Sequence, residues 1–198
     1  MSLSELNNYQ IWTSFKRGEE WAVSYIYSEF AEKLYQYGLK FTSDIPAVED
    51  ALQDLFAELI NKRKRLGNTD NILLYLLKCY KRKLLRKIKF ESRFFRESEM
   101  ETYQFDVTWS VEHELILEEI SQNRARLLLN ALKELTPRQK EAIYLRYTKE
   151  MDYNEVAEMM DISIEGARNL ISRAISTIKR KFTPEKNQDL MVLFLLAF

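Results

Sequence analysis

Residue types that catalysis or covalent cross-linking requires are scarce in this chain. Of its 198 residues, one is a cysteine, Cys79, and one is a histidine, His113. A single cysteine excludes an intramolecular disulfide and a cysteine-based zinc cluster. Because no carboxylates are grouped as a metal site either, we expect no catalytic residue, no metal, no cofactor and no small-molecule substrate.

Glycine and proline are also rare, with four and three residues respectively. A loop-rich β protein or an enzyme that cradles phosphates normally has more of both. Hydrophobic residues make up 46% of the chain, which excludes general disorder. The composition therefore predicts a mostly helical protein, long enough for one large or two small domains.

Long hydrophobic runs are missing. The longest apolar run, residues 190–198, is shorter than the roughly 20 residues that a membrane-spanning helix needs. The N-terminus does not have the pattern of a secretory leader. We therefore expect a cytoplasmic protein.

The formal net charge of zero hides a segregation of charge along the chain. Residues 60–96 contain thirteen Lys or Arg and two acidic residues, whereas residues 97–123 contain eight acidic residues and no Lys or Arg. Residues 124–182 are basic again, with twelve Lys or Arg against eight acidic residues. Two basic segments separated by an acidic one fit two DNA-facing surfaces, although charge runs are also common on solvated helices.

Helical periodicity predicts four helices in the N-terminal half. The first covers residues 6–15 and ends at Gly18, and the second weakens at Gly38. Pro46 fits the first turn of the third helix, and the fourth begins near Asn71. The apolar stripe expected for this basic fourth helix is Leu73, Leu74, Leu77, Leu84, Leu85 and Ile88.

Residues 91–123 lose the regular apolar period, and we interpret them as a linker with a helix resuming near Val111. Four helices are predicted after it. The first ends near Leu135, the second opens at Thr136-Pro137, and the others begin near Asp152 and Ser163.

The last two of these helices have the spacing of a helix-turn-helix. Asp152 and Glu155 form a D-x-x-E capping pattern, Asp161 can adopt a left-handed turn, and Ser163 can cap the second helix. An ordinary helical hairpin is the alternative. The buried stripe expected for the second helix is Ala167, Leu170, Ile171, Ala174, Ile175 and Ile178.

Two stretches resemble extracytoplasmic-function sigma factors. The segments LKELTPRQKEAIYLRY, YNEVAEMM and SIEGARNLISRAISTIKR are similar to the fourth region of that family. The segments VEDALQDLFAELINKR and ILLYLLKCYKRKLLRKIK are similar to its second region. The matches follow the family's order, with a linker in place of its third region.

The resemblance implies an all-α fold with two helical domains joined by an acidic linker. Residues 1–96 would form a region 2-like bundle that binds core RNA polymerase and recognises and melts the minus-ten element. Residues 97–123 would be the acidic linker, and 124–182 a region 4-like helix-turn-helix domain for the minus-thirty-five element. Residues 183–198 would be an apolar tail.

The resemblance also implies the site residues. Polymerase binding falls on Asp50, Gln53, Asp54 and Phe56, although a place in the core is favoured over direct contact for Phe56. The minus-ten element falls on Lys64, Arg65, Asn68, Tyr75, Lys78, Arg82, Lys83 and Arg86, with Tyr75 equally plausible as core. The minus-thirty-five element falls on Ser163, Arg168, Asn169, Ser172, Arg173 and Lys179.

Core RNA polymerase and promoter DNA are thus the expected partners, together with a membrane-anchored anti-sigma factor. The apolar tail is similar to that of some members from Bacteroidota and could dock on the C-terminal domain, bind a partner helix or aggregate. A helix-turn-helix regulator with an N-terminal sensing or dimerisation domain is the alternative, but it leaves the acid-faced helix and the basic segment unexplained. A nuclease is a third, disfavoured by the lack of catalytic residues.

Overall fold

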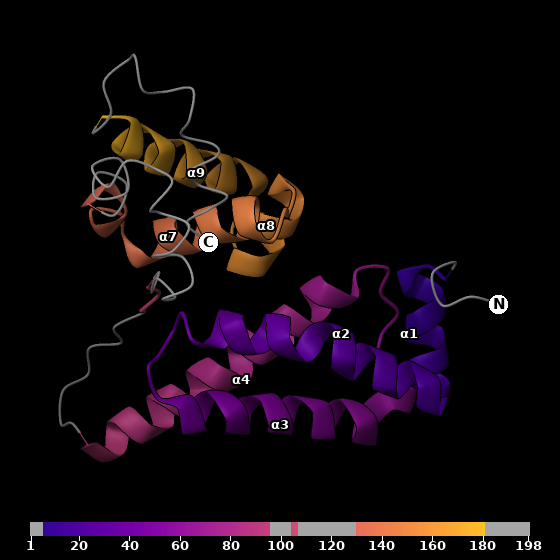
Figure 1. The fold of residues 1–198 in the computed structure, drawn as a ribbon. Coiled ribbons are helices and arrows are strands. Elements are labelled where there is room, and N and C mark those ends of the chain that lie inside the picture. Colours follow the sequence, from indigo (N-terminus) through magenta and orange to yellow (C-terminus); the bar gives the residue numbers. More distant parts are fainter. Residues whose placement is uncertain (1–5, 96–103, 107–129, 181–198) are drawn as a thin grey trace, which may run out of the picture. The chain divides into compact units, whose positions relative to one another are not determined.

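The structure, a computed structural model, describes residues 6–95, 104–106 and 130–180, with only the backbone described for 91–95. Within these ranges the chain is helical and contains no strand, so the fold is all-α, as the sequence predicts. The chain divides into two compact units, Met1–Thr102 and Tyr103–Phe198 (Figure 1).

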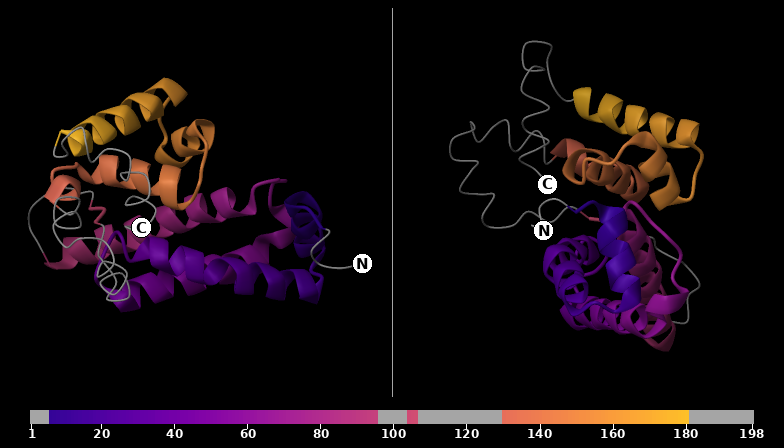
Figure 2. Two further views of the ribbon diagram at one scale, coloured as in Figure 1. Left: turned by 45° about the horizontal axis from the view of Figure 1, so that its top comes forward. Right: turned by 90° about the vertical axis from the view of Figure 1, so that its right-hand side faces the viewer.

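Unit 1 is a bundle in which α2, α3 and α4 pack against one another, while α1 contacts α2 and the loop before α4. Figure 2 shows the three long helices lying side by side in both of its views. The elements are α1 (Asn8–Arg17), α2 (Glu20–Gly38), α3 (Ile45–Lys62), the 3-10 helix η2 (Arg63–Arg65) and α4 (Ile72–Phe95).

The helix ends of unit 1 lie where local sequence signals predict them. Gly18 ends α1 in the left-handed conformation, with φ of 84°. Asp44 caps α3, and Pro46 lies in its first turn. The Oδ1 atom of Asn71 accepts a 2.9 Å hydrogen bond from the backbone N–H of Leu74 at the start of α4. Side-chain caps satisfy the backbone donors at the starts of α3 and α4, and the left-handed glycine ends α1.

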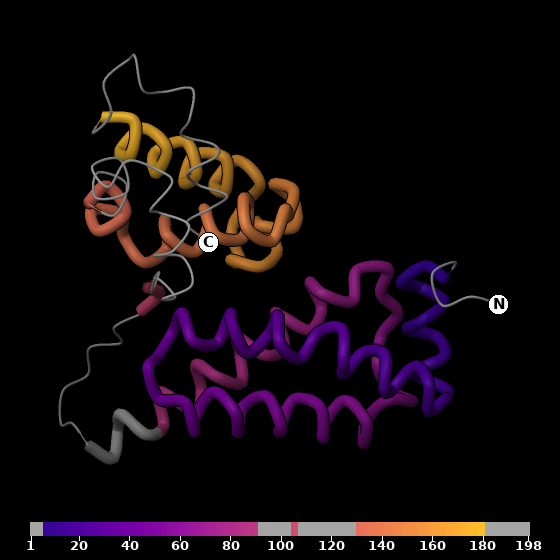
Figure 3. Tube along the Cα trace, viewed as in Figure 1, coloured from indigo at the N-terminus to yellow at the C-terminus, as the bar shows by residue number. Residues whose placement is uncertain are grey.

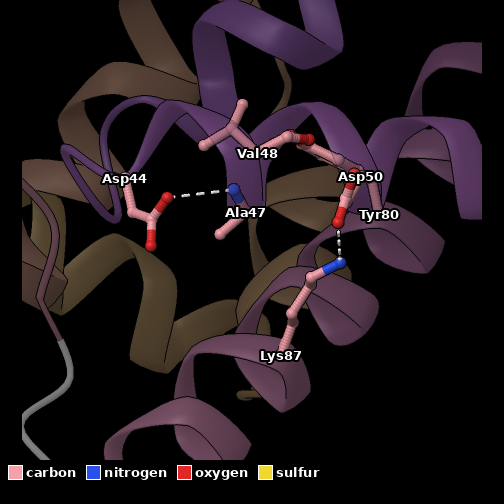
Figure 4. A network of polar contacts seen from close by, with 6 residues as sticks. All are labelled: Asp44, Ala47, Val48, Asp50, Tyr80 and Lys87. Atoms are coloured by element: carbon pink, nitrogen blue, oxygen red, sulfur yellow. Dashed lines mark hydrogen bonds and ion pairs between the residues drawn. The ribbon is translucent and has the colours of Figure 1, made fainter.

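Tyr80 joins the three long helices of unit 1. Its side chain is fully buried, and its hydroxyl donates a 3.1 Å hydrogen bond to the carbonyl of Val48 on α3 (Figure 4). A Cβ atom placed on Gly38 of α2 would lie 2.2 Å from the Tyr80 hydroxyl. Gly38 therefore makes room for Tyr80 rather than only weakening the end of α2.

The buried stripe of α4 differs in part from the predicted one. Leu74, Leu77 and Leu84 are buried as expected, but Leu73, Leu85 and Ile88 are only partly buried. The core positions that the prediction missed are Ile72, Leu76 and Tyr80. Because α4 packs against both α2 and α3, its buried face is wider than a single stripe.

Unit 2 contains a helical stretch at 130–133, followed by α7 (Pro137–Ile143), the π-helical turn η3 (Tyr144–Thr148), α8 (Tyr153–Met160) and α9 (Ile164–Lys179). Figure 3 shows the sharp turn between α8 and α9, and α9 packs on both α7 and α8. Thr136 caps α7 with Pro137 at its first position, as predicted.

Part of the predicted linker packs on unit 2. Phe105 is 1% exposed, and its ring centroid lies 5.6 Å from that of Tyr144. Asp106 forms a 2.7 Å ion pair with Lys140 of α7. The remainder of the predicted linker, the helix expected near Val111 and the apolar tail 183–198 lie outside the described residues.

Candidate nucleic-acid interface

The helix-turn-helix of unit 2 is built from local capping interactions. The Asp152 carboxylate accepts hydrogen bonds from the N–H groups of Asn154 and Glu155, at 2.7 and 2.8 Å, while the Glu155 side chain accepts from the Asp152 N–H. The hydrogen bond from the Glu155 N–H is the main reason that the pKa of Asp152 is lowered. This confirms the predicted capping box at the start of α8.

The turn between α8 and α9 also forms as predicted. Asp161 adopts the left-handed conformation, with φ of 55°. Ser163 follows it, and its hydroxyl accepts a 3.0 Å hydrogen bond from the N–H of Gly166. A left-handed residue reverses the chain and a side-chain cap starts the next helix, so two short polar residues set the angle at which α9 leaves α8.

The face of α9 that points away from α7 and α8 is polar and exposed. Its buried side is formed by Ala167, Ile171, Ala174 and Ile178, while Leu170 and Ile175 are only partly buried. All residues predicted for the minus-thirty-five element are exposed: Ser163, Arg168, Asn169, Ser172, Arg173 and Lys179. Their spacing along one helix suits the insertion of α9 into a major groove.

Helix α4 of unit 1 is basic but partly neutralised by α3. Lys78, Arg82 and Arg86 are exposed. Lys83 forms an ion pair with Glu58 of α3, which also pairs with Lys62 at 2.6 Å. Hydrogen bonds from Lys62 and Lys83 lower the pKa of Glu58 to about 2. Lys83 is therefore less available to a phosphate than its three exposed neighbours.

The loop before α4 is held by α1. The indole N–H of Trp12 donates a 2.8 Å hydrogen bond to the carbonyl of Gly67, and the Lys16 ammonium donates a 2.6 Å bond to Asn68. Lys64 and Arg65 are exposed on the same segment. Lys64 and Arg65 are thus exposed in η2, and α1 holds the chain just after them, at Gly67 and Asn68.

Tyr75 lies at the edge of the core and beside a cavity. Its ring packs edge-on against Trp12, with centroids 4.9 Å apart. Burial raises the pKa of its hydroxyl. Tyr75 also lines a cavity of about 140 Å³ between α3 and α4, together with Cys79, Arg82, Lys83 and Arg86. Tyr75 therefore contributes to the edge of the core, and part of its side chain lines this cavity.

The acidic residues of α3 face different neighbours. Asp50 forms a 2.7 Å ion pair with Lys87 of α4 (Figure 4). Gln53 and Asp54 are exposed. Phe56 is 7% exposed and packs against Tyr27 of α2, with ring centroids 4.9 Å apart, while Tyr27 itself is 57% exposed. Of these two packed rings, that of Tyr27 is accessible and that of Phe56 is buried.

Sequence reasoning missed several residues that shape these surfaces. Trp12 falls on the apolar stripe of the predicted helix at residues 6–15, and only the fold shows it bonded to a loop 55 residues away. Tyr27 received no role, and only the fold shows that its ring is exposed. Tyr153 begins the first helix of the motif and received no functional role, yet its ring lies beside Arg168. No signal in one sequence marks such pairings between elements.

The described residues show no group of three or more His, Cys, Asp or Glu side chains able to hold a metal ion. Among those same residues, no helix combines the length and apolar character that crossing a membrane requires.

The comparisons with known proteins agree with this architecture. Residues 125–178 match the family model for Sigma-70, region 4. The chain is similar to the sigma factor RpoE of Bartonella quintana, solved with the anti-sigma factor NepR, with a TM-score of 0.57 and 16% identity over 85% of this chain and 96% of that one.

A second similar structure is CnrH, solved with the cytosolic domain of CnrY. The TM-score is 0.54 and the identity 14%, over 86% of this chain and 93% of that one. No match is found among curated proteins. At these identities the likeness to the two solved sigma factors shows the fold alone. Residues 125–178 match Sigma-70 region 4, and this match, on a chain with the same all-α fold, supports a function in transcription initiation.

Proposed function

We propose that this protein is an extracytoplasmic-function type sigma factor in which unit 2 reads the minus-thirty-five element through α9. The observation that carries this proposal is the division of α9 into a buried apolar side and an exposed face that holds all the predicted base and phosphate contacts. Arg and Asn side chains hydrogen-bond base edges, and the basic end of α9 can pair with phosphates.

In the same proposal, unit 1 recognises and melts the minus-ten element with α4 and the loop before it. The exposed cations Lys64, Arg65, Lys78, Arg82 and Arg86 would follow the strand backbone. The cavity beside Tyr75 is open between the two helices and would receive an extruded base, since aromatic rings stack on bases of any sequence. Asn68 and Lys83 belong to the predicted set, and each already has a partner within the chain.

The polymerase would dock on the exposed side of α3. Asp54 and Gln53 are accessible there, and Tyr27 of α2 adds an exposed aromatic ring beside Phe56. An exposed carboxylate on α3 suits a basic helical partner, and an exposed aromatic ring can contribute to the buried centre of an interface. Asp50 would contribute only by exchanging its bond to Lys87.

Regulation is proposed to follow the solved relatives. RpoE and CnrH were both solved as complexes, with NepR and with the cytosolic domain of CnrY respectively. We accordingly include a membrane-anchored anti-sigma factor among the partners and place the protein in the cytoplasm. Sigma factors act by binding, so we propose no catalytic activity. The resemblance of the C-terminal tail to members from Bacteroidota remains a prediction.

Run-off transcription tests the central claim. DNA fragments that bind the holoenzyme reconstituted with core RNA polymerase would first be selected and sequenced. On such a template, we expect transcripts only when both the polymerase and this protein are present. Duplex binding by the protein alone, with no effect on polymerase, would instead support a helix-turn-helix regulator.

Polymerase docking has its own test. Asp54→Lys should weaken binding to core polymerase about tenfold or more, because it places a cation against a basic partner. Glu32→Lys makes the same change of charge at an exposed position of α2 and serves as the matched control. Equal binding of the two variants to core polymerase would show that Asp54 of α3 is not part of the interface. Asp50→Lys is a poorer probe because it also releases Lys87.

A further inference from the structure

Two guanidinium groups lie against one aromatic ring at the start of the helix-turn-helix. The Tyr153 ring centroid is 5.2 Å from the Cζ atom of Arg146 and 5.5 Å from that of Arg168. Arg146 comes from η3 and Arg168 from the exposed face of α9, so the ring of α8 connects three elements. Both distances are within the range of about 6 Å for cation–π attraction.

The side of this cluster away from α9 is firmly held. The Arg146 guanidinium donates a 2.9 Å hydrogen bond to the carbonyl of Met151, and it also lies 5.9 Å from the centroid of the Tyr147 ring. Tyr153 follows directly on Asp152, whose capping box fixes the first turn of α8. Tyr153 is therefore a positioned surface against which Arg168 rests.

A ring holds an arginine differently from a carboxylate. An ion pair would neutralise Arg168 and would have to be broken when DNA binds. A ring orients the guanidinium through its face and leaves the positive charge and the N–H donors available. A planar guanidinium that keeps its donors free suits bidentate hydrogen bonding to O6 and N7 of guanine, the most common specific arginine contact in a major groove.

We propose that Tyr153 is a positioning residue that orients Arg168 toward a guanine of the minus-thirty-five element and so sets the base preference there. This inference rests on the proposed function, because it requires α9 to enter the major groove. Tyr153 itself need not touch DNA. Its contribution is specific to one base pair, whereas a merely structural contribution would affect all positions alike.

The test measures base preference with the reconstituted holoenzyme and a panel of promoters that carry every single-base change in the minus-thirty-five element. Tyr153→Leu removes the ring, and Tyr153→Phe keeps it while removing the hydroxyl. Tyr153→Leu should reduce the preference for guanine at one position about two- to fivefold, the effect of losing one exposed cation–π contact. Tyr153→Phe should retain it.

Tyr147→Leu is the matched control, because it removes a ring from Arg146 and leaves Tyr153 beside Arg168. It should not change the preference. Should Tyr153→Leu lower the helical content of the protein, Tyr153→Met, which fills similar space without an aromatic face, replaces it. An unchanged preference in the folded variant, or an equal loss at every position, would overturn the proposal.

Arg168→Ala separates this inference from the proposed function. If it leaves all preferences unchanged, Arg168 does not read the promoter, and the role of this part of α9 must be revised. If it removes the guanine preference while Tyr153→Leu preserves it, α9 keeps its role and only the positioning by Tyr153 is wrong.

Discussion

Two lysines of α4 and one arginine of α9, all on candidate DNA-binding helices, are held in different ways. On α4, Lys83 and Lys87 pair with Glu58 and Asp50 of α3. On α9, Arg168 rests against the ring of Tyr153. A carboxylate partner cancels charge and must be exchanged for a phosphate, whereas a ring leaves the charge in place.

This difference fits the tasks proposed for the two helices. Reading a base edge requires a side chain in one orientation, and a ring supplies that orientation. Guiding a melted strand requires cations that can move among phosphates, and exposed lysines and arginines on α4 satisfy this need. In the proposed function, Asp50 and Glu58 of α3 would then moderate how tightly α4 holds nucleic acid.

The packing of α4 against α2 depends on a tight contact between Tyr80 and Gly38. In Gly38→Ala, the overlap of the new methyl group with the buried Tyr80 hydroxyl should cost about 1–3 kcal/mol. Alanine recovers roughly 1 kcal/mol over glycine within a helix, so the net loss of stability should be up to about 2 kcal/mol. Urea unfolding followed by circular dichroism measures the change.

Tyr80→Phe provides the second half of this experiment. It removes the atom nearest to the added methyl group, at the expense of the hydrogen bond to Val48. The loss of stability in the double variant should be smaller than the sum of the losses in the two single variants. Strict additivity would show that Gly38 and Tyr80 do not interact.

The placement of α9 depends on its cap instead. Ser163→Ala should cost about 1 kcal/mol of stability, since it leaves the Gly166 N–H without its acceptor. Ser163→Asp keeps an acceptor but turns a negative charge toward DNA. It should preserve thermal stability and weaken promoter binding, and equal losses of stability in both variants would contradict a capping role.

The features that could be predicted from the sequence are local. The caps at Asp152 and Ser163 and the left-handed Asp161 follow from residue types only a few positions apart. The outward face of α9 follows from helical periodicity in the same way. These features define the helix-turn-helix, which is why the exposure of each residue predicted for the candidate site in unit 2 could be anticipated.

The features that could not be predicted join distant parts of the chain. Asp50 and Lys87 are 37 residues apart, and Trp12 and Gly67 are 55 apart. Phe105 has no periodic neighbours, so its burial against Tyr144 had no sequence signal. Charge alone predicts that Lys83 faces DNA, and only the packing of α3 on α4 shows that Glu58 is its partner.

Removing the Glu58 carboxylate, the partner of Lys83, should strengthen DNA binding. Glu58→Gln eliminates a negative charge beside α4 and releases Lys62 and Lys83, so promoter affinity should rise about two- to threefold at low salt. The salt dependence should also become steeper, because more counterions are displaced from the DNA. Glu29→Gln, which frees Lys33 on α2, is the control and should have no effect on affinity.

The same carboxylate makes a small, pH-dependent contribution to stability. The pKa of Glu58 falls from 4.5 to about 2 on folding, so its ion pairs stabilise the protein fully above about pH 5. This contribution decreases as the pH falls through 4.5 and disappears near pH 2. Its size at neutral pH should be about 1 kcal/mol or less, because the Glu58 side chain is 40% exposed and the pairs are screened by solvent. Urea unfolding of the native protein and Glu58→Gln between pH 3 and 7 would therefore give curves that converge toward the acidic end; a constant difference would mean that the lowered pKa makes no contribution to stability.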